Sequence, residues 1–515
     1  MSPLILFSFV IAYFLILLIV AWYTSKNSNN DTFFSGNKNS NWMLVAFGMI
    51  GTSLSGVTFV SVPGGVGDYS GAAFKGFAYM QVAIGYLIGY AIIAFVLLPL
   101  YYRLNLTSIY NYLLQRFGVI AYKTGALFFI ISRTFGATAR LYLVINILQV
   151  FILDKLHVPF LVTAAVILLM ILLYTFEGGV KTIVYTDTLQ TSLMIIGLVV
   201  CVIFILSELH LSGGEAISQI RDRGYFNVFN YDVNSKGFFL KQIVGGAFIT
   251  IAMTGLDQEM MQKNISVKKL GNSQKNIIIM SICLVSVLFL FLVLGGLLYL
   301  YTTSKGAAYT EIMVNGKMTK QLLLNGSNIL GDKIFPTVAM NMLPPAISIM
   351  FIIALISALF PSADGALTAL TSSFCIDILG LKSRDDLDDK GKKRLRLLVH
   401  LCFTIVFLIC IWVFYVIADN SVIDIILDLA GYTYGPLLGL FAFGIFTKRQ
   451  LPNSILITLL CLISPAICYL LNLYSPQLFG AYKIGIEMLL INGIVTFSGL
   501  LLISTKGDTK ANNLV

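Results

Sequence analysis

The stretch IALISALFPSADGALTALTSSFCIDIL, residues 353–379, has the pattern of a membrane helix that carries polar groups at depth. Ser362 and Asp364 lie beside a proline and a glycine, and hydroxyl side chains continue along the helix: Thr368, Thr371, Ser372 and Ser373. A charged side chain at the centre of a membrane helix costs roughly 2.5–3.5 kcal/mol on insertion scales. Hydroxyl and carboxylate oxygens are the ligands that small hard cations prefer. We therefore predict an ion site, with a polar seam between packed helices as the alternative.

The composition predicts an all-α polytopic membrane protein. Of the 515 residues, 58% are hydrophobic and 11% are charged, against about 25% charged in a soluble domain. Backbone groups in lipid must be paired within the spanning structure, and the long apolar runs do not alternate, so helices are expected rather than a barrel. The net charge of +10 is explained by basic residues on the cytoplasmic side, so we expect no nucleic-acid partner.

Hydropathy predicts about thirteen transmembrane helices in a single transporter domain that occupies 1–515. They are expected at about 4–23, 42–69, 74–102, 122–151, 158–176, 179–208, 239–262, 272–302, 345–380, 394–418, 422–447, 452–474 and 484–504. The first lacks a basic flank and a cleavage site, so we expect a retained helix. The dense basic cluster at 382–396 predicts an outside N-terminus and a cytoplasmic C-terminus, in the plasma membrane.

One connection between spans is expected to carry a small hairpin. Within 303–344, Asn315 and Gly316 join two short runs with strand-like composition, the strongest short-range hairpin signal. Residues 209–238 contain an amphipathic piece at about 216–224.

Two of the predicted spans carry the signs of broken helices. The second contains GTSLSGVTFVSVPGG from Gly51, and the seventh contains GLDQEMMQK from Gly255. Glycine and polar residues inside a span free backbone carbonyls, which are tolerated where they line a cavity or hold an ion. The two spans are five apart and run in opposite senses, the pattern of a five-plus-five inverted repeat. Close helix packing at glycine is the alternative explanation.

Five motifs in order resemble the sodium:solute symporter family across roughly residues 1–505. They are GTSLSGVTF in the second span, EGGVKTIVYTDTLQ at 177–190, GLDQEMMQK in the seventh span, SADGALTALTSSFCIDIL in the ninth span and GYTYGPLLGLFAFGIF in the eleventh. The resemblance implies the LeuT-type fold. One peripheral helix, 4–23, would precede repeats at about 42–208 and 239–447, and peripheral helices would follow at about 452–504.

The resemblance also implies a sodium site between the second and ninth spans. Its ligands would be the carbonyls of Gly56, Phe59 and Ala358 and the hydroxyl of Ser362. The chain departs from the family at Pro361, where a second hydroxyl residue is usual, and Asp364 or a water would compensate. Some members bind a second sodium near the position of Asp187. We therefore include Asp364 and Asp187 among the candidate sodium ligands.

The solute would bind at the midplane, with Thr58, Gln81, Arg140, Asp257 and Gln258 as candidate contacts. Arg140 matches a position that sialic acid transporters use to hold a carboxylate, but the position of their second arginine is Pro63 here. An intramembrane arginine is expected to be functional. The competing interpretation of Arg140 is an internal pair with Asp257, Asp187 or Asp364. Two tyrosines of the eleventh span, Tyr432 and Tyr434, could gate the pathway or fill the core.

We predict a sodium-coupled symporter that imports a small organic solute, carrying a carboxylate, by alternating access. Its ligands would be Na+ and the solute, it would sit in the lipid bilayer, and it would work as a monomer. Histidines and cysteines show no catalytic or metal spacing, so we expect no enzymatic activity. The alternatives are a proton-coupled symporter, a symporter of a neutral sugar or polyol, and, more remotely, a membrane-embedded solute sensor.

Overall fold

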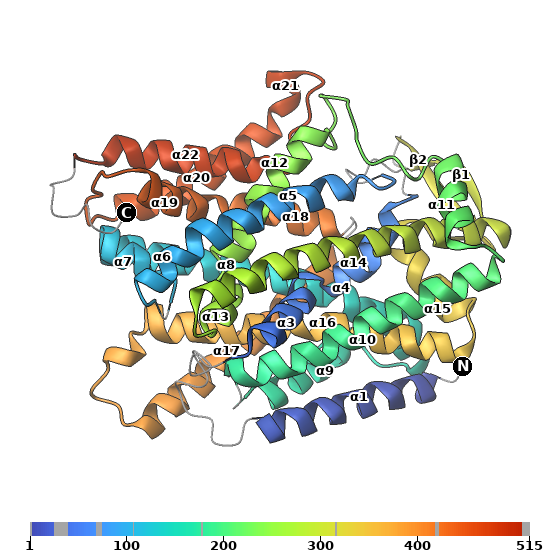
Figure 1. The fold of residues 1–515 in the computed structure, drawn as a ribbon, viewed down its shortest axis with the longest axis horizontal. Helices are drawn as coiled ribbons and strands as arrows, with labels where there is room; N and C mark the ends of the chain where they lie inside the picture. The colour runs from blue at the N-terminus through green and yellow to red at the C-terminus, as the bar shows by residue number, and fades with distance from the viewer. Residues whose placement is uncertain are drawn as a thin grey trace.

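The computed structural model describes residues 3–24, 40–67, 75–106, 108–176, 179–314, 317–417 and 422–506. These ranges form a bundle of long helices (Figure 1). Eight segments in them are long and apolar enough to cross a membrane: α1 (Pro3–Thr24), α5 with η2 and α6 (Tyr79–Ile92, Ile93–Leu97, Leu98–Arg103), α8 with η3 and η4 (Val119–Leu148, Gln149–Leu153, Asp154–Leu156), α10 (Gly179–Glu208), α14 (Leu270–Ser304), α16 with η7 (Pro345–Ser373, Phe374–Ile378), α17 (Asp389–Ile417) and α20 (Leu456–Leu473).

Three further spans are sharply bent, which gives eleven spans among the described residues if each bent pair counts once. The pairs are α3 (Trp42–Ser53) with α4 (Gly56–Gly65), bent by 55°; α12 (Phe239–Thr250) and η5 (Ile251–Gly255) with α13 (Gln258–Ile265), bent by 66°; and α18 (Val422–Thr433) with α19 (Gly435–Phe446), bent by 44°. Two shorter apolar helices, α9 (Phe160–Thr175) and α22 (Met488–Ile503), coincide with the remaining predicted spans.

Each of the first two bends lies where the sequence predicts a broken helix. In the first, Leu54 and Ser55 leave the helical conformation and α4 restarts at Gly56. In the second, Asp257 is extended and caps α13, accepting hydrogen bonds from the backbone N–H groups of Glu259 and Met260. The bend between α18 and α19 was not predicted. It precedes Pro436, which has no backbone N–H and so cannot donate a hydrogen bond to the preceding turn of a helix.

The two ends of the bundle differ in what caps them (Figure 1). A small sheet lies beside α11 (Gly213–Asp222) at the end where α1 begins, and we call this the hairpin end. The predicted hairpin strands are confirmed as β1 (Ala308–Val314) and β2 (Lys317–Leu324), which pair antiparallel; β3 (Ser327–Asn328) completes the sheet. Residues 315 and 316 of the turn lie outside the described ranges.

The opposite end, which we call the C-terminal end, carries α7 and the last described residues (Figure 1). The short elements that complete the fold are α7 (Asn111–Phe117), η6 (Gly331–Lys333), α15 (Ile334–Asn341), η8 (Leu381–Ser383) and α21 (Ser475–Phe479). The helix built from the stretch that opened the sequence analysis, α16, runs unbroken through Pro361, and every residue from Ala354 to Ser373 is buried. The polar groups of α16 therefore lie at the centre of the bundle.

Candidate functional site

The break between α3 and α4 lies directly against α16. A Cβ built on Gly56 would be 3.9 Å from the backbone N of Leu359 and would overlap the side chain of Val144 on α8. The first distance is an ordinary van der Waals contact, so it is the side chain of Val144 on α8 that favours glycine at this position. The structure therefore brings the predicted sodium ligands of the second and ninth spans to one place.

Two backbone carbonyls near this contact lose their usual helical donor because of proline. Pro63 lies inside α4, four residues after Phe59, and Pro361 lies inside α16, four residues after Ser357. Since proline has no N–H, the carbonyls of Phe59 and Ser357 lack the hydrogen bond that the next turn would donate. The freed carbonyl of Phe59 suits a hard cation. Pro361, which departs from the family pattern, thus frees a backbone oxygen.

Ser362 and Asp364 face different partners although they are two residues apart. The Ser362 hydroxyl is fully buried and donates to the carbonyl of Leu359, 2.8 Å away, within its own helix. Asp364 accepts from the Tyr174 hydroxyl of α9 at 2.8 Å and from the N–H of Gly365 at 2.5 Å. Ala358 is fully buried one turn before Ser362. Asp364 is therefore directed to α9, and its part in a sodium site stays a prediction.

A continuous chain of buried charges lies at the second break. The Lys263 ammonium of α13 is 2.8 Å from an oxygen of Asp187 on α10 and 3.3 Å from one of Glu259. Glu259 also pairs with Arg133 of α8, and Arg133 approaches Asp257 at 3.8 Å. All five side chains are at most 3% exposed. This chain joins α8, α10 and α13, the half-helix after the break.

Lys263 is a central member of this chain of charges that the sequence analysis missed. Its ammonium also donates to the Thr52 hydroxyl at 2.7 Å, so it ties the end of α3 to α10 and α13. A buried carboxylate requires a compensating charge, and Lys263 supplies it to Asp187. The signal was available: Lys263 follows Glu259 by four residues, the spacing of neighbours on one helix face.

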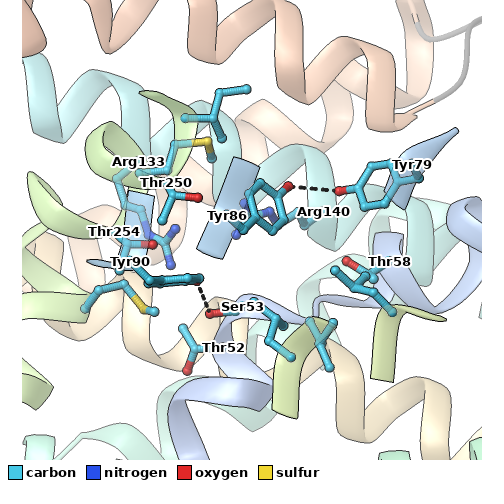
Figure 2. Close-up of a pocket in the computed structure, with 16 residues that line it drawn as sticks. Thr52, Ser53, Thr58, Tyr79, Tyr86, Tyr90, Arg133, Arg140, Thr250 and Thr254 are labelled. Atoms are coloured by element: carbon cyan, nitrogen blue, oxygen red, sulfur yellow. Dashed lines mark hydrogen bonds between the residues drawn. The ribbon is translucent and has the colours of Figure 1, made fainter. Parts of the chain in front are cut away.

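A pocket lies beside the same break, between α3, α4, α5, α8, α12, α13 and α14 (Figure 2). Its volume is about 80 Å³. Hydroxyl side chains, two arginines and apolar groups line it: Thr52, Ser53, Thr58, Tyr79, Tyr86, Tyr90, Thr250, Thr254, Arg133, Arg140, Leu54, Ile249, Met253, Met260, Leu284 and Leu288. The Tyr79 and Tyr86 hydroxyls lie 3.0 Å apart, and that of Tyr90 lies 3.5 Å from Ser53.

The two arginines of the pocket differ in their partners. Arg133 pairs with Glu259, whereas Arg140 forms no ion pair or hydrogen bond with any side chain in the described ranges. The carboxylates that could have paired with Arg140 have other partners: Asp257 with Arg133 and Tyr434, Asp187 with Lys263, and Asp364 with Tyr174. In Figure 2, Arg140 lies among the pocket tyrosines.

Several of the predicted solute contacts and gates lie outside this pocket. Gln81 is buried, and its side-chain amide donates hydrogen bonds to the backbone carbonyls of Ala78 and, at 3.5 Å, of Gly237. Gln258 accepts from the N–H of Ile109 at 3.0 Å. Tyr432 accepts from Asn472 of α20 at 2.9 Å, away from the pocket lining. Of the predicted contacts, Thr58 and Arg140 line the pocket.

Asp257 and Tyr434, neither of which lines the pocket, form a hydrogen bond that connects two of the bends. The Tyr434 hydroxyl, just before α19, donates to Asp257 at 3.1 Å. Two backbone carbonyls at the break between α12 and α13 accept hydrogen bonds from tyrosine hydroxyls. Tyr101 donates to the carbonyl of Gly255 at 2.8 Å, and Tyr110 donates to that of Leu256 at 2.9 Å. The break between α12 and α13 is thus satisfied by protein donors, in contrast to the carbonyl of Phe59 at the other break.

Comparison with known families agrees with this arrangement. The model of the sodium:solute symporter family matches residues 33–460. A sodium/sialic acid symporter of Aliivibrio fischeri is 24% identical over 479 residues, covering 92% of this chain and 88% of that protein. Sodium/glucose cotransporter 1 of Oryctolagus cuniculus is 23% identical over 493 residues, covering 86% of this chain and 68% of that protein.

Solved structures resemble the whole bundle. A substrate-bound, outward-open sodium-coupled sialic acid symporter superposes with a TM-score of 0.78 at 20% identity, covering 98% of this chain and 99% of that one. Mhp1 in an inward-facing conformation gives a TM-score of 0.52 at 13% identity, covering 92% and 93%. These likenesses confirm the LeuT-type fold that the family resemblance implied.

Proposed function

Because this chain belongs to the sodium:solute symporter family and is a sodium-coupled symporter of a small organic solute, we propose that its solute is a small hydroxylated carboxylate held by Arg140. The two repeats are assigned to about 42–208 and 239–447. The protein would import its solute across the plasma membrane. The distribution of basic residues indicates that the hairpin end faces outside.

The single observation that carries this proposal is the isolation of Arg140. A guanidinium remains charged at any physiological pH, and a charge inside a membrane protein is costly without a counter-charge. The acidic side chains around the pocket have other partners, so an arriving anion supplies the charge that Arg140 lacks. The planar guanidinium matches a carboxylate with two parallel hydrogen bonds, and such charge-assisted bonds are roughly twice as strong as neutral ones.

The rest of the lining supports a hydroxylated solute. Eight hydroxyl-bearing side chains surround the pocket, and a site built to hydrogen-bond hydroxyl groups discriminates strongly against analogues that lack them. Relatives named as sodium/sialic acid symporters transport a carboxylate, and a relative named for glucose transports a neutral sugar. The isolated Arg140 favours the first class, while Pro63 in place of a second arginine favours a different acid from sialic acid.

The sodium ion is the coupled cargo, and we assign it to the contact between α4 and α16. The carbonyls of Gly56, Phe59 and Ala358 and the hydroxyl of Ser362 would hold it, because proline frees the carbonyl of Phe59 and α4 packs against α16 at Gly56. An ion shared by two helices holds them in one arrangement. Thermodynamic reciprocity then requires the solute to raise sodium affinity by the factor by which sodium raises solute affinity.

The chain of ion pairs would control access from one end. Arg133 lines the pocket and also pairs with Glu259, which in turn contacts Lys263. Movement of α13 away from α8 and α10 would separate these pairs together. We assign Asp187 to this closure. Its Oδ2 atom is occupied by Lys263 and Thr52, so the ammonium stands where a second cation would bind that oxygen.

A solute screen by thermal unfolding tests the proposal. A ligand that binds the folded state stabilises it by about 2.7 kcal/mol at one hundred times its dissociation constant. Purified protein in sodium chloride, and in choline chloride at equal ionic strength, should be heated with hydroxylated carboxylates and with their amide or alcohol isosteres. We expect stabilisation by a carboxylate that requires sodium. Equal stabilisation by a neutral isostere would favour a neutral sugar or polyol and contradict the role of Arg140.

A further inference from the structure

A second cavity opens on the outside of the bundle at the C-terminal end. It has a volume of about 300 Å³ and lies between the end of the third span and the end of α19. Its lining is Phe95, Val96, Pro99, Leu100, Arg103, Tyr112 and Ile445. We call this set the α6–α19 groove. Phe95 is 64% exposed and Val96 44% exposed, and both belong to a helix that crosses the membrane, so the groove faces lipid chains.

The polar end of the groove is basic. Arg103, the last residue of α6, is exposed, and none of the seven lining residues is acidic. Arg116 lies 4% exposed beside the end of α19, where one of its nitrogens donates to the carbonyls of Thr447 and Arg449, both at 2.9 Å. Its other two guanidinium nitrogens have no hydrogen-bond partner within the described ranges. Lys448 and Arg449 follow Thr447 in the chain, and the guanidinium of Arg449 donates to the hydroxyl and carbonyl of Ser504.

An apolar groove that ends at a basic cluster matches an anionic phospholipid. Acyl chains fill apolar surface along a span, and a phosphate diester pairs with guanidinium groups at the level where the span ends. Basic pockets between transmembrane helices on the cytoplasmic side recognise anionic lipid headgroups in this way. The groove contains a π-helical turn, η2, which includes Phe95 and Val96; such turns are frequent at functional sites.

We propose that the α6–α19 groove binds one anionic phospholipid, with its phosphate at Arg103 and an acyl chain along Phe95, Val96 and Ile445. The site lies apart from the solute pocket, and none of its lining residues is shared with it.

The site is linked to the moving part of the transporter through one neighbour. Tyr102, adjacent to Arg103, donates its hydroxyl to the carbonyls of Asn264 and Val267 at 3.0 and 2.5 Å, at the end of α13. A lipid that fixes the end of α6 therefore also fixes the anchor of α13. We expect transport to depend on the headgroup of the lipid as well as on sodium.

The test measures lipid binding directly on the full purified chain. Native mass spectrometry should count retained lipids after titration with phosphatidylglycerol or phosphatidylcholine of equal chain length. We expect one phosphatidylglycerol to be retained preferentially. Arg103→Gln should weaken this binding about fivefold, the factor that one basic side chain contributes near an anionic headgroup. Val96→Trp should weaken it as much, because it fills the groove without changing any charge.

Lys123→Gln is the matched control, because Lys123 is exposed near the start of α8 and does not line the groove. It should leave retention unchanged. Each variant should first show wild-type thermal unfolding, and Val96→Leu replaces Val96→Trp if the larger residue impairs folding. Equal retention of the two lipids, equal loss in Lys123→Gln and Arg103→Gln, or unchanged retention in the Val96 variants would each overturn the proposal.

Discussion

The ammonium of Lys263 lies 2.8 Å from the carboxylate of Asp187, and both side chains are at most 3% exposed. The pair joins α13, the half-helix after the second break, to α10. Because Lys263 also bonds Thr52 at the end of α3, both broken spans meet at this one ammonium. A movement of either break must therefore change the surroundings of the same buried charge.

Removing this ammonium should destabilise the fold. Lys263→Met leaves Asp187, and in part Glu259, as buried carboxylates without their counter-charge, a loss of roughly 3–5 kcal/mol for a broken buried pair. Lys263→Arg keeps the charge and should retain most of the stability. Thermal unfolding of the purified variants measures both effects. Lys123→Met, at an exposed position on α8, is the control, and a Lys263→Met variant as stable as that control would show that the pair is dispensable.

The same substitution to lysine should have different effects at the two arginines of the pocket. Arg140→Lys keeps the charge but loses the planar fork, so the apparent KM for the solute should rise strongly while thermal stability stays near wild type. Arg133→Lys should lower stability, because Arg133 holds Glu259 within the ion-pair chain. Transport kinetics and unfolding should be measured on both variants. Loss of stability in Arg140→Lys equal to that in Arg133→Lys would make Arg140 a scaffold residue.

Ser362→Ala should weaken the sodium dependence of transport. A lost oxygen ligand is expected to cost at least as much as a neutral hydrogen bond, about 0.5–1.5 kcal/mol, which corresponds to roughly a two- to tenfold rise in half-saturating sodium. Ser372→Ala is a matched control, since Ser372 is a fully buried serine of the same helix whose hydroxyl has no partner in the described ranges. If both variants show the same sodium dependence, Ser362 is not a ligand.

Gly56→Leu should abolish transport. A side chain here would overlap Val144 of α8, so α4 would have to move and the carbonyls assigned to sodium would be displaced relative to Ser362. Gly136→Leu provides a control, because a Cβ at Gly136 meets no atom within 4 Å. Uptake should persist in the control. Wild-type uptake by Gly56→Leu would remove the first break from the sodium site.

Local sequence signals predicted the fold because they act within one segment. Glycine and polar residues inside apolar runs located the bends after Ser53 and Gly255, and Asn315–Gly316 located the hairpin strands. The bend before Gly435–Pro436 carried a weaker signal, since proline also occurs within straight helices such as α16. Length and composition support up to eleven spans among the described residues, so the total of about thirteen stays a prediction.

The partners in the site could not be predicted because they come from distant segments. Asp187 and Lys263 are 76 residues apart, and Arg133 and Glu259 are 126 apart. The sequence shows that each charge needs a partner, but the packing of α8, α10 and α13 decides which. Gln81 was predicted to contact the solute, yet its side-chain amide donates a hydrogen bond to a backbone carbonyl in a nearby connection. Arg140 was predicted by its depth, and the structure adds that neighbouring acids pair elsewhere.

The most direct measurement of the central account is uptake of the stabilising carboxylate into proteoliposomes under imposed sodium gradients. Wild-type protein should accumulate the labelled solute above its external concentration when sodium is higher outside, and should lose it when the gradient is reversed. A proton gradient without sodium should not replace it, and Arg140→Gln should abolish accumulation while sodium still stabilises the protein. Accumulation driven by protons alone, or by sodium equally well in Arg140→Gln, would contradict the account.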